Sequence, residues 1–401
     1  MYKLLLIKRT IEDILISPFI LVGRLIALIK PLKKTYRIYF FFPFYHTGGA
    51  ELFNMQLVNA VGGADCIIYF TRKSGNDRFY EDFESSGCVI RDISWFTDNK
   101  LIYFMNLVYR GIISGYINKQ KKKPIIFNGQ CNFGYKLSPW VNKKIPQLEF
   151  IHTFCSMSYI RTPFIPYYTY TLSSSTKTIS DHQAFYRKQN VPETYFNNFK
   201  YILYGIDLPS QKINLSKQND VKVLFVGRGS PEKRVHLVAL MAKEVHKSNA
   251  GIRFEFMGDV REAIPNDLHP YCYFWDNQTD KEKIDSIYKS ADVLIITSLF
   301  EGFPLVVMEA MARGLAIIST NVGDIPIHIK DGENGFIIRE TFNENIIIQK
   351  GVEFIIRLNI NKELLNNISK NNVDYAVKHF GIKTFNQQYK SLFASLKQQA
   401  N

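Results

Sequence analysis

The sequence predicts an α/β protein with two similar domains, each built on a parallel β-sheet. Short apolar runs alternate with helical stretches along the first half of the chain. Such alternation is typical of parallel sheets with helices on both faces. A polar stretch at residues 208–220 interrupts the series, and a second series of the same kind follows it. Because ligands of such sheets bind beyond the carboxyl ends of the strands, we expect the functional residues there.

The apolar runs set the domain limits. We expect strands at 36–42, 66–70, 88–93, 124–127 and 148–152 before the polar stretch, and at 221–226, 253–257, 293–297, 316–319 and 335–338 after it. The organisation that follows is an N-terminal apolar and basic helix at 1–34, a first domain at 35–207, a linker at 208–220, a second domain at 221–375, and a final helix at 376–401 that packs back on the first domain.

The composition favours an anionic partner. Lys and Arg number 50 against 36 Asp and Glu, which gives the 401 residues a net charge of +14. Such an excess attracts phosphorylated small molecules, an anionic membrane or nucleic acid, with a merely solvated basic face as the alternative. No long basic run carries interleaved aromatic residues, so nucleic acid is not expected. The five cysteines form no C-x-x-C pair, which fits a reducing cytosol without disulfide or zinc.

The N-terminal segment is the part of the chain that would contact a membrane. Residues 14–29 are almost wholly apolar, but they are shorter than the ~20 residues of a spanning helix. Glu12 and Asp13 at its start argue against a signal peptide. Basic residues flank it at Lys8, Arg9, Lys30, Lys33 and Lys34. We therefore expect a helix in the membrane interface and a protein peripheral on the cytoplasmic face, with packing on the protein or a true span as alternatives.

The strongest chemical motif follows the expected strand 293–297. Glu301 lies in the loop after this strand, Pro304 suits the first position of a helix, and Gly314 suits its end. Glu309 then lies about a turn and a half into that helix. The free N–H groups and the dipole at the helix start suit a pyrophosphate, while the carboxylates suit sugar hydroxyls. Solvated glutamates on a buried helix are the alternative.

A glycine-rich turn with two cations follows the expected strand 221–226. Gly227 opens the turn, and Arg228 and Lys233 follow at the carboxyl end of the strand. Arginine clamps phosphate with two hydrogen bonds and lysine adds a mobile charge, so together they would neutralise a departing diphosphate. The spacing is not that of a P-loop, which makes a kinase or ATPase a poor interpretation. Surface cations in an ordinary turn are the alternative.

Two further features lie at the carboxyl edge of the first predicted sheet. Gly48 and Gly49 follow its first strand, where glycine lets backbone approach a ligand, although double glycines are common in plain turns. His152 ends the strand 148–152, and a hydrogen-bonded structural histidine is the alternative to a catalytic one. The histidines show no metal-ligand spacing, and no two aspartates stand two positions apart. We therefore expect no metal, so Arg, Lys and a helix dipole must meet the leaving-group charge.

In their order and spacing, these motifs resemble retaining glycosyltransferase family 4, the group 1 glycosyl transferases of the GT-B fold. The resemblance implies two Rossmann-like domains facing across a cleft, with C-terminal helices. It covers residues 36–390 and rests on Gly-Gly-x-Glu at 48–51, Thr178-Ile179-Ser180, Tyr204-Gly205-Ile206-Asp207, Gly227-Arg228 with Lys233, Glu301 with Glu309, Gly323 and the turn at 331–335. The chain departs from the family pattern at Tyr204, at Arg234 in place of a glycine, and at Gly258-Asp259-Val260.

The resemblance implies a role for each candidate residue. Arg228 and Lys233, in the loop that Gly227 opens, would bind the diphosphate of a nucleotide-sugar donor, and the backbone of Gly48 and Gly49 would approach it. The donor's ribose and sugar would be held by Glu309, by Glu301, by backbone amides near Gly302, Phe303 and Leu305, and by His152. The reaction would retain the anomeric configuration and need neither metal nor cofactor.

The expected function is transfer of a hexose or related sugar from the nucleotide-sugar to a glycan or lipid-linked acceptor, as in bacterial surface polysaccharide synthesis. The alternatives are a nucleotide-sugar 2-epimerase of the same fold and a catalytically silent scaffold. The expected partners are the donor, the acceptor and an anionic membrane surface.

Overall fold

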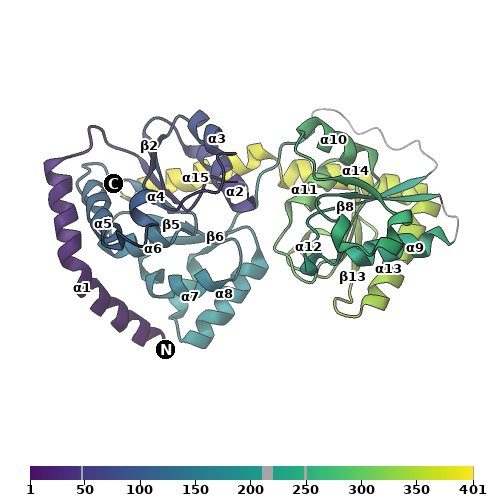
Figure 1. Cartoon of the computed structure of the whole chain (residues 1–401), viewed down its shortest axis with the longest axis horizontal. Helices are drawn as coiled ribbons and strands as arrows, with labels where there is room; N and C mark the ends of the chain where they lie inside the picture. Colours follow the sequence, from purple (N-terminus) through teal and green to yellow (C-terminus); the bar gives the residue numbers. More distant parts are fainter. Residues whose placement is uncertain (47, 210–219, 248–250, 401) are drawn as a thin grey trace. The chain divides into compact units, whose positions relative to one another are not determined.

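The computed structural model describes residues 1–46, 48–209, 220–247 and 251–400. Its contacts divide the chain into two units, Met1–Leu203 with Phe385–Asn401, and Tyr204–Thr384. Each unit holds one parallel sheet with helices packed on it (Figure 1). The prediction of two Rossmann-like α/β domains is therefore confirmed. Of the predicted linker 208–220, residues 210–219 lie outside the described part of the chain.

The first unit contains a seven-stranded sheet in the order β3-β2-β1-β4-β5-β6-β7, with all neighbours parallel. Its strands are β1 (Ile38–Phe42), β2 (Cys66–Phe70), β3 (Val89–Asp92), β4 (Ile125–Asn128), β5 (Gln147–Phe150), β6 (Tyr170–Ser173) and β7 (Phe199–Tyr201). The order reverses between β1 and β4, and this topological switch point is where α/β sheets bind ligands. Gly48 and Gly49 follow β1 and therefore lie at the switch point.

Strands β6 and β7 extend the sheet beyond the sequence prediction. β6 has the mixed sequence YTLS, and β7 is a three-residue strand with no buried residue. Neither presents the continuous apolar run from which the other strands are predicted. The five strands predicted in this part of the chain are all present with small shifts at their ends.

The long helix α1 (Tyr2–Ile29) packs along α5 (Tyr103–Asn118), and the two lie side by side in Figure 1. Glycine allows this close approach, because a Cβ at Gly111 would lie only 2.2 Å from the carbonyl oxygen of Ile20. The predicted apolar segment 14–29 is thus the second half of a helix whose inner face is covered by protein. Within the described ranges, no helix has the length and apolar character needed to cross a membrane.

Shorter helices complete the first unit. They are α2 (Gly49–Val61), α3 (Tyr80–Ser85), α4 (Ser94–Thr97), α6 (Asn132–Leu137), α7 (Ser156–Arg161) and α8 (Thr176–Gln189). The last helix of the chain, α15 (Ile382–Ala400), belongs to this unit from Phe385 onward. Its Phe385 and Tyr389 rings pack against Phe53 of α2, with centroids 6.0 Å away in both cases.

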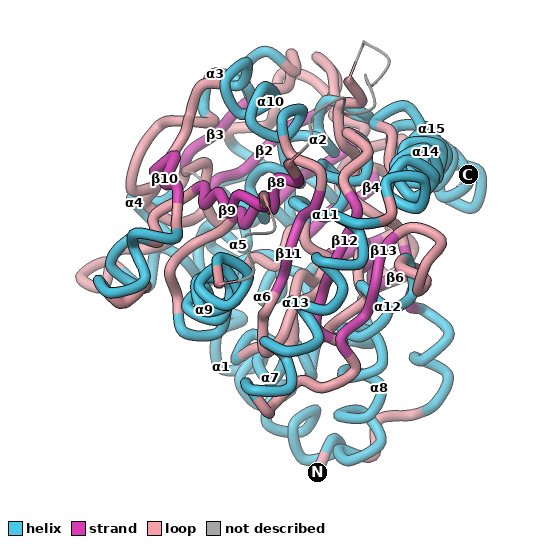
Figure 2. Tube along the Cα trace, turned by 90° about the vertical axis from the view of Figure 1, so that its right-hand side faces the viewer, coloured by secondary structure: helices cyan, strands magenta, loops and turns pink. Residues whose placement is uncertain are grey.

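The second unit contains a six-stranded parallel sheet in the order β10-β9-β8-β11-β12-β13, and β11, β12 and β13 run side by side in Figure 2. Its strands are β8 (Val221–Val226), β9 (Ile252–Met257), β10 (Tyr273–Asp276), β11 (Val293–Ile296), β12 (Ala316–Thr320) and β13 (Gly335–Ile338). The sequence misses only β10, an edge strand whose first and last residues are exposed. The order reverses between β8 and β11, which places the second switch point there.

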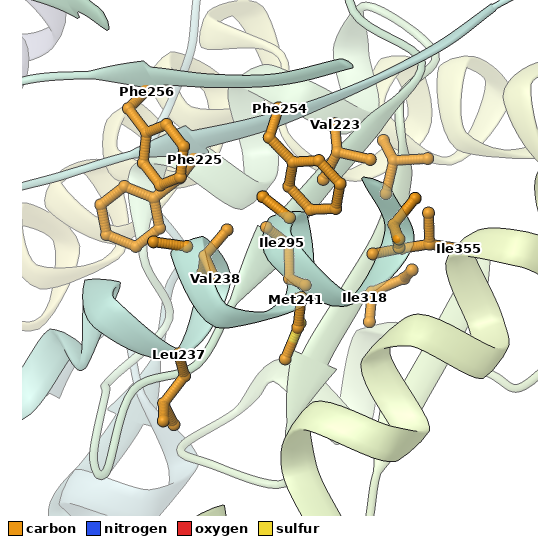
Figure 3. Close-up of a cluster of buried hydrophobic side chains, with 14 of the residues drawn as sticks. Val223, Phe225, Leu237, Val238, Met241, Phe254, Phe256, Ile295, Ile318 and Ile355 are labelled. Atoms are coloured by element: carbon orange, nitrogen blue, oxygen red, sulfur yellow. The ribbon is translucent and has the colours of Figure 1, made fainter. Parts of the chain in front are cut away.

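The core of the second unit fixes the strands that carry the candidate site. Val223 and Phe225 of β8 and Ile295 of β11 face Val238 and Met241 of α9 (Figure 3). All five side chains are at most 3% exposed. Because such a core is close-packed, it holds the carboxyl ends of β8 and β11 rigidly beside each other. The helices of this unit are α9 (Val235–His246), α10 (Lys281–Ser290), α11 (Leu305–Ala312), α12 (Ile325–His328), α13 (Glu344–Ile360) and α14 (Lys362–His379).

Candidate active site

The turns after β8 and β11 bring Lys233 and Glu301 together. Lys233 Nζ lies 2.6 Å from Glu301 Oε1, and the hydroxyl of Ser298 donates to the same oxygen at 2.7 Å. The side chains of the lysine and the glutamate are 22% and 11% exposed. Sequence spacing predicted both residues at this edge, and the structure adds that they form a half-buried ion pair.

Arg228 stands apart from this ion pair. Its side chain is 81% exposed, and its nearest carboxylate oxygen is that of Glu232, 3.9 Å from the guanidinium. It lies in the same turn as Lys233, so both cations belong to the carboxyl end of β8, as predicted. The guanidinium projects into solvent, where it is available to a ligand arriving at this edge.

Arg234 is a residue of this turn to which the sequence assigned no role in binding. Its backbone adopts the left-handed conformation, with φ 49°, at the position where the family pattern has glycine. Its buried guanidinium donates to the carbonyl oxygens of Thr297 at 2.7 Å, Ser298 at 3.2 Å and Thr341 at 2.7 Å. The side chain therefore ties the turn after β8 to the end of β11, and its departure from glycine was the only sequence signal.

A second glycine contact supports the loop of Glu301 from behind. Gly323 has φ 57°, and a Cβ there would lie 2.0 Å from the carbonyl oxygen of Gly302 and 2.5 Å from that of Glu301. The amide of Asp324 donates to the Gly302 carbonyl at 2.8 Å. Only glycine fits at position 323, because a side chain would push the Glu301 loop out of place.

Helix α11 begins one residue later than the sequence predicts. Pro304 has ψ 137° and is the residue before the helix, so its prediction as the first helical residue is wrong. The extended backbone of Pro304 leaves Leu305 as the first helical residue. Gly314, with φ 76°, follows the helix end as expected. The Phe303 ring is buried against His328, with centroids 4.1 Å apart, so this residue offers a ligand only its backbone.

Glu309 is half-buried on α11 and accepts a hydrogen bond from the phenol of Tyr288 on α10, at 2.9 Å. Burial raises the pKa of Glu309, and the phenol together with Arg313 opposes that rise. Nothing in the sequence pointed to Tyr288, because its partner lies 21 residues further along the chain.

The structure gives a reason for the glycine at position 258, but not for the missing second glycine of Gly258-Asp259-Val260. Gly258 has φ 125°, and a Cβ there would lie 2.0 Å from the carbonyl oxygen of Gly227. The amides of Gly227 and Gly229 donate to the carbonyls of Met257 and Asp259 at 3.0 and 2.7 Å. The turns after β8 and β9 therefore lie in direct backbone contact.

In the first unit, Gly48 and Gly49 lie at the N-terminus of α2. Gly48 is the residue before the helix, and a Cβ there would lie 2.1 Å from Glu51 Oε2, whereas a Cβ on Gly49 would meet no atom within 4 Å. The buried carboxylate of Glu51 also lies 3.9 Å from Nε2 of His46. The N-terminus of α2 thus already holds the negative charge of Glu51. The backbone at Gly49 is the part of this helix start that is open to a ligand.

His152 lies beyond the strand that was predicted to end on it. β5 ends at Phe150, and the His152 ring packs at 4.7 Å from the Phe150 ring and 5.6 Å from the Phe53 ring. Burial lowers the pKa of His152 to about 4, so the imidazole is neutral at pH 7. It can exchange a hydrogen bond with a ligand, but it does not supply positive charge. Across the described ranges, no group of three or more His, Cys, Asp or Glu side chains is placed to hold a metal ion.

The chain folds into two Rossmann-like units, and the motifs of the second unit lie at the switch point of its sheet. This architecture is the GT-B class of fold. The crystal structure of Anabaena HepE in complex with UDP and glucose superimposes with a TM-score of 0.67 at 16% identity, covering 90% of this chain and 100% of that one. Residues 209–374 match the family model of the group 1 glycosyl transferases. The similarity to the group 1 glycosyl transferases is therefore carried by this C-terminal segment of the chain.

Two curated relatives agree with this family. An uncharacterized glycosyltransferase of Methanocaldococcus jannaschii is 31% identical over 165 residues, which are 36% of this chain and 41% of that protein. The UDP-Gal:alpha-D-GlcNAc-diphosphoundecaprenol alpha-1,3-galactosyltransferase of Escherichia coli is 30% identical over 196 residues, 46% of this chain and 48% of that protein. The chain thus spans less than half the length of each of these relatives.

We predict that two substitutions of Arg234 distinguish the stability that its hydrogen bonds contribute from the stability that its left-handed backbone costs. Hydrogen bonds from a charged group are worth about 1.5–3 kcal/mol each, and a side chain in the left-handed region costs about 1 kcal/mol more than glycine. In urea unfolding, Arg234→Ala and Arg234→Gly should both lower the free energy of unfolding by at least about 2 kcal/mol. The glycine variant should be the more stable of the two by about 1 kcal/mol. Arg228→Ala, at the exposed neighbour, should change stability by under about 0.5 kcal/mol. Equal stability of the two Arg234 variants would contradict the left-handed strain.

Proposed function

We propose that this protein transfers a hexose or related sugar from a nucleotide-sugar donor to a glycan or lipid-linked acceptor, with retention of configuration and without a metal. The observation that carries the proposal is the Lys233–Glu301 ion pair at the carboxyl ends of β8 and β11. It lies at a topological switch point, in a part of the chain that matches the group 1 glycosyl transferases.

The ion pair suits a departing diphosphate. A lysine ammonium carries three donors, and the contact with Glu301 uses one of them. The others, with the Arg228 guanidinium and the first amides of α11, would stabilise the charge that develops on the phosphate oxygens. The bond between the anomeric carbon and the phosphate oxygen breaks, the acceptor oxygen bonds to that carbon from the same face, and its proton passes to the leaving phosphate. Glu301 and the amides near Gly302, Phe303 and Leu305 would hold sugar hydroxyls, and Glu309 would hold the ribose.

For residues of the first unit we propose roles that follow the family pattern. The neutral His152 imidazole would hydrogen-bond the donor sugar, since burial removes its charge. The open backbone at Gly49, with Gly48, would approach the diphosphate. These assignments rest on the family pattern and on the placement of the residues after β1 and β5.

The substrates of similar proteins support the classes of donor and acceptor that we propose for this chain. The Escherichia coli relative is a galactosyltransferase that takes UDP-Gal and acts on a diphosphoundecaprenol-linked sugar, and Anabaena HepE binds UDP and glucose. For this chain we propose a UDP-sugar donor and a lipid-linked acceptor, as in bacterial surface polysaccharide synthesis. An acceptor of that kind would be presented at the cytoplasmic face of a membrane.

We further propose that the outer face of α1 rests on an anionic membrane. One face of the helix packs on α5, while the other exposes a row of large apolar side chains: Leu4, Ile7, Ile11, Ile14, Leu15, Leu21, Val22, Leu25, Leu28 and Ile29. Lysines border that row, with Lys3 before it, Lys8 between Ile7 and Ile11, and Lys30, Lys33 and Lys34 after it. An apolar face bordered by cations is what an interfacial helix presents to anionic lipid.

The transfer proposal predicts that Lys233→Ala and Arg228→Ala each lower turnover of a UDP-sugar 10²–10³-fold, or about 3 kcal/mol of transition-state stabilisation. Analysis of the products with and without an acceptor also tests the epimerase alternative, because an epimerase would isomerise the donor when no acceptor is present. Lys243→Ala removes the same charge from an exposed site on α9 and should leave turnover unchanged. Near-normal turnover in both site variants would refute the phosphate clamp.

The membrane proposal predicts that serine at Ile14, Leu21 and Leu25 together weakens binding to vesicles of anionic phospholipid at least about tenfold, since each side chain loses most of its burial energy in the bilayer. Substitution is the sharper test, because removal of α1 would also uncover α5. Serine at the exposed Phe342 and Ile360 of the second unit is the control and should change nothing. Equal vesicle binding by the triple variant and the wild type would reject α1 as the membrane face.

A further inference from the structure

The carboxylate of Glu309 is held from one side by a buried phenol. Tyr288 lies on α10, 1% exposed, and its hydroxyl donates to Glu309 Oε2 at 2.9 Å. The other oxygen, Oε1, accepts no hydrogen bond from any residue that the structure describes. One oxygen is therefore fixed inside the protein while the other remains to bind a ligand.

The phenol can only act as a donor in this contact. Burial and the nearby Glu309 carboxylate both raise the pKa of Tyr288, so its hydroxyl keeps its proton at neutral pH. For Glu309 itself, burial raises the pKa, whereas the hydrogen bond from Tyr288 and the charge of Arg313 lower it. The phenol thus helps to keep a half-buried carboxylate ionised.

Arg313 holds the phenol ring in place. Its guanidinium carbon lies 5.3 Å from the centroid of the Tyr288 ring, its Nε donates to Asp285 Oδ1 at 2.8 Å, and its Nη1 donates to the Glu309 carbonyl at 3.1 Å. Asp285 and Tyr288 both come from α10, and Arg313 follows the end of α11. This bracing restricts the phenol to one orientation relative to the carboxylate.

We propose that Tyr288 is a positioning residue that aims the free Oε1 of Glu309 at the vicinal hydroxyls of the donor's ribose and keeps the carboxylate charged for them. The proposal rests on the ribose role of Glu309 proposed above. It adds that nucleotide affinity depends on a residue that touches no ligand atom. An ionised carboxylate with one oxygen already engaged offers the ribose diol a single, directed acceptor.

The test compares UDP with 2′,3′-dideoxy-UDP, which lacks both ribose hydroxyls, by calorimetry on the full chain. Wild-type protein should bind UDP about tenfold more tightly than the dideoxy compound, the size of one hydrogen bond to a charged group. Tyr288→Phe should abolish most of that preference, weakening UDP binding about tenfold and dideoxy-UDP binding less than about twofold. Equal loss for both compounds, or no loss for UDP, would overturn the proposal.

A double-mutant cycle separates this inference from the function on which it rests. Glu309→Gln should also abolish the preference for UDP, and the Tyr288→Phe and Glu309→Gln double variant should bind UDP no more weakly than Glu309→Gln alone. If the Glu309→Gln variant still prefers UDP to the dideoxy compound, the ribose role of Glu309 is wrong. If only the Tyr288→Phe variant still shows this preference, the positioning role of Tyr288 is wrong. Tyr273→Phe, an exposed phenol of the same unit, is the matched control.

The pH dependence supplies a second readout that loss of packing would not move. Tyr288 and Arg313 are the groups that act on Glu309, and Asp285 acts through Arg313. The carboxylate favours UDP only when ionised, so affinity is full above its pKa and falls as the pH drops through it. Tyr288→Phe removes a contribution that lowers this pKa. The acid limb of the curve of UDP affinity against pH should therefore move to higher pH in this variant. An unmoved acid limb would contradict the proposal.

Discussion

The ion pair between Lys233 and Glu301 is the interaction on which the candidate site depends. It joins the turns that follow β8 and β11, two neighbouring strands at the point where the order of the sheet reverses. Both side chains are largely withdrawn from water, so their attraction is screened less than that of a surface pair. The pair holds a cation at the strand edge while leaving most of its donors for a phosphate.

The backbone around the pair leaves little freedom to change its geometry. The Arg234 guanidinium ties the first turn to the end of β11 through the carbonyls of Thr297 and Ser298, and to the segment after β13 through that of Thr341. Gly323 lies so close to the carbonyl of Gly302 that no side chain fits there, and Gly258 lies equally close to Gly227. Preorganised donors of this kind are worth more to a reaction than flexible ones, because they need no reorganisation as charge develops.

The sequence predicts much of this arrangement and misses particular parts for physical reasons. Buried apolar runs mark the central strands, whereas β7 and β10 lie at sheet edges and carry exposed residues, so no run marks them. Motif spacing places Lys233 and Glu301 at one edge but cannot show that they touch, since 68 residues separate them. Tyr288 has no local signature, because its partner is distant in the sequence, and the structural role of Arg234 is signalled only by its departure from the family's glycine.

We propose that protein cations, rather than a divalent ion, neutralise the departing diphosphate. The most direct measurement is turnover of a UDP-sugar in EDTA, followed by addition of Mn²⁺ or Mg²⁺ in excess of the chelator. If Lys233 and Arg228 carry that charge, the rate in EDTA equals the untreated rate and added metal leaves it unchanged. A rate that vanishes in EDTA and returns with Mn²⁺ would contradict the claim.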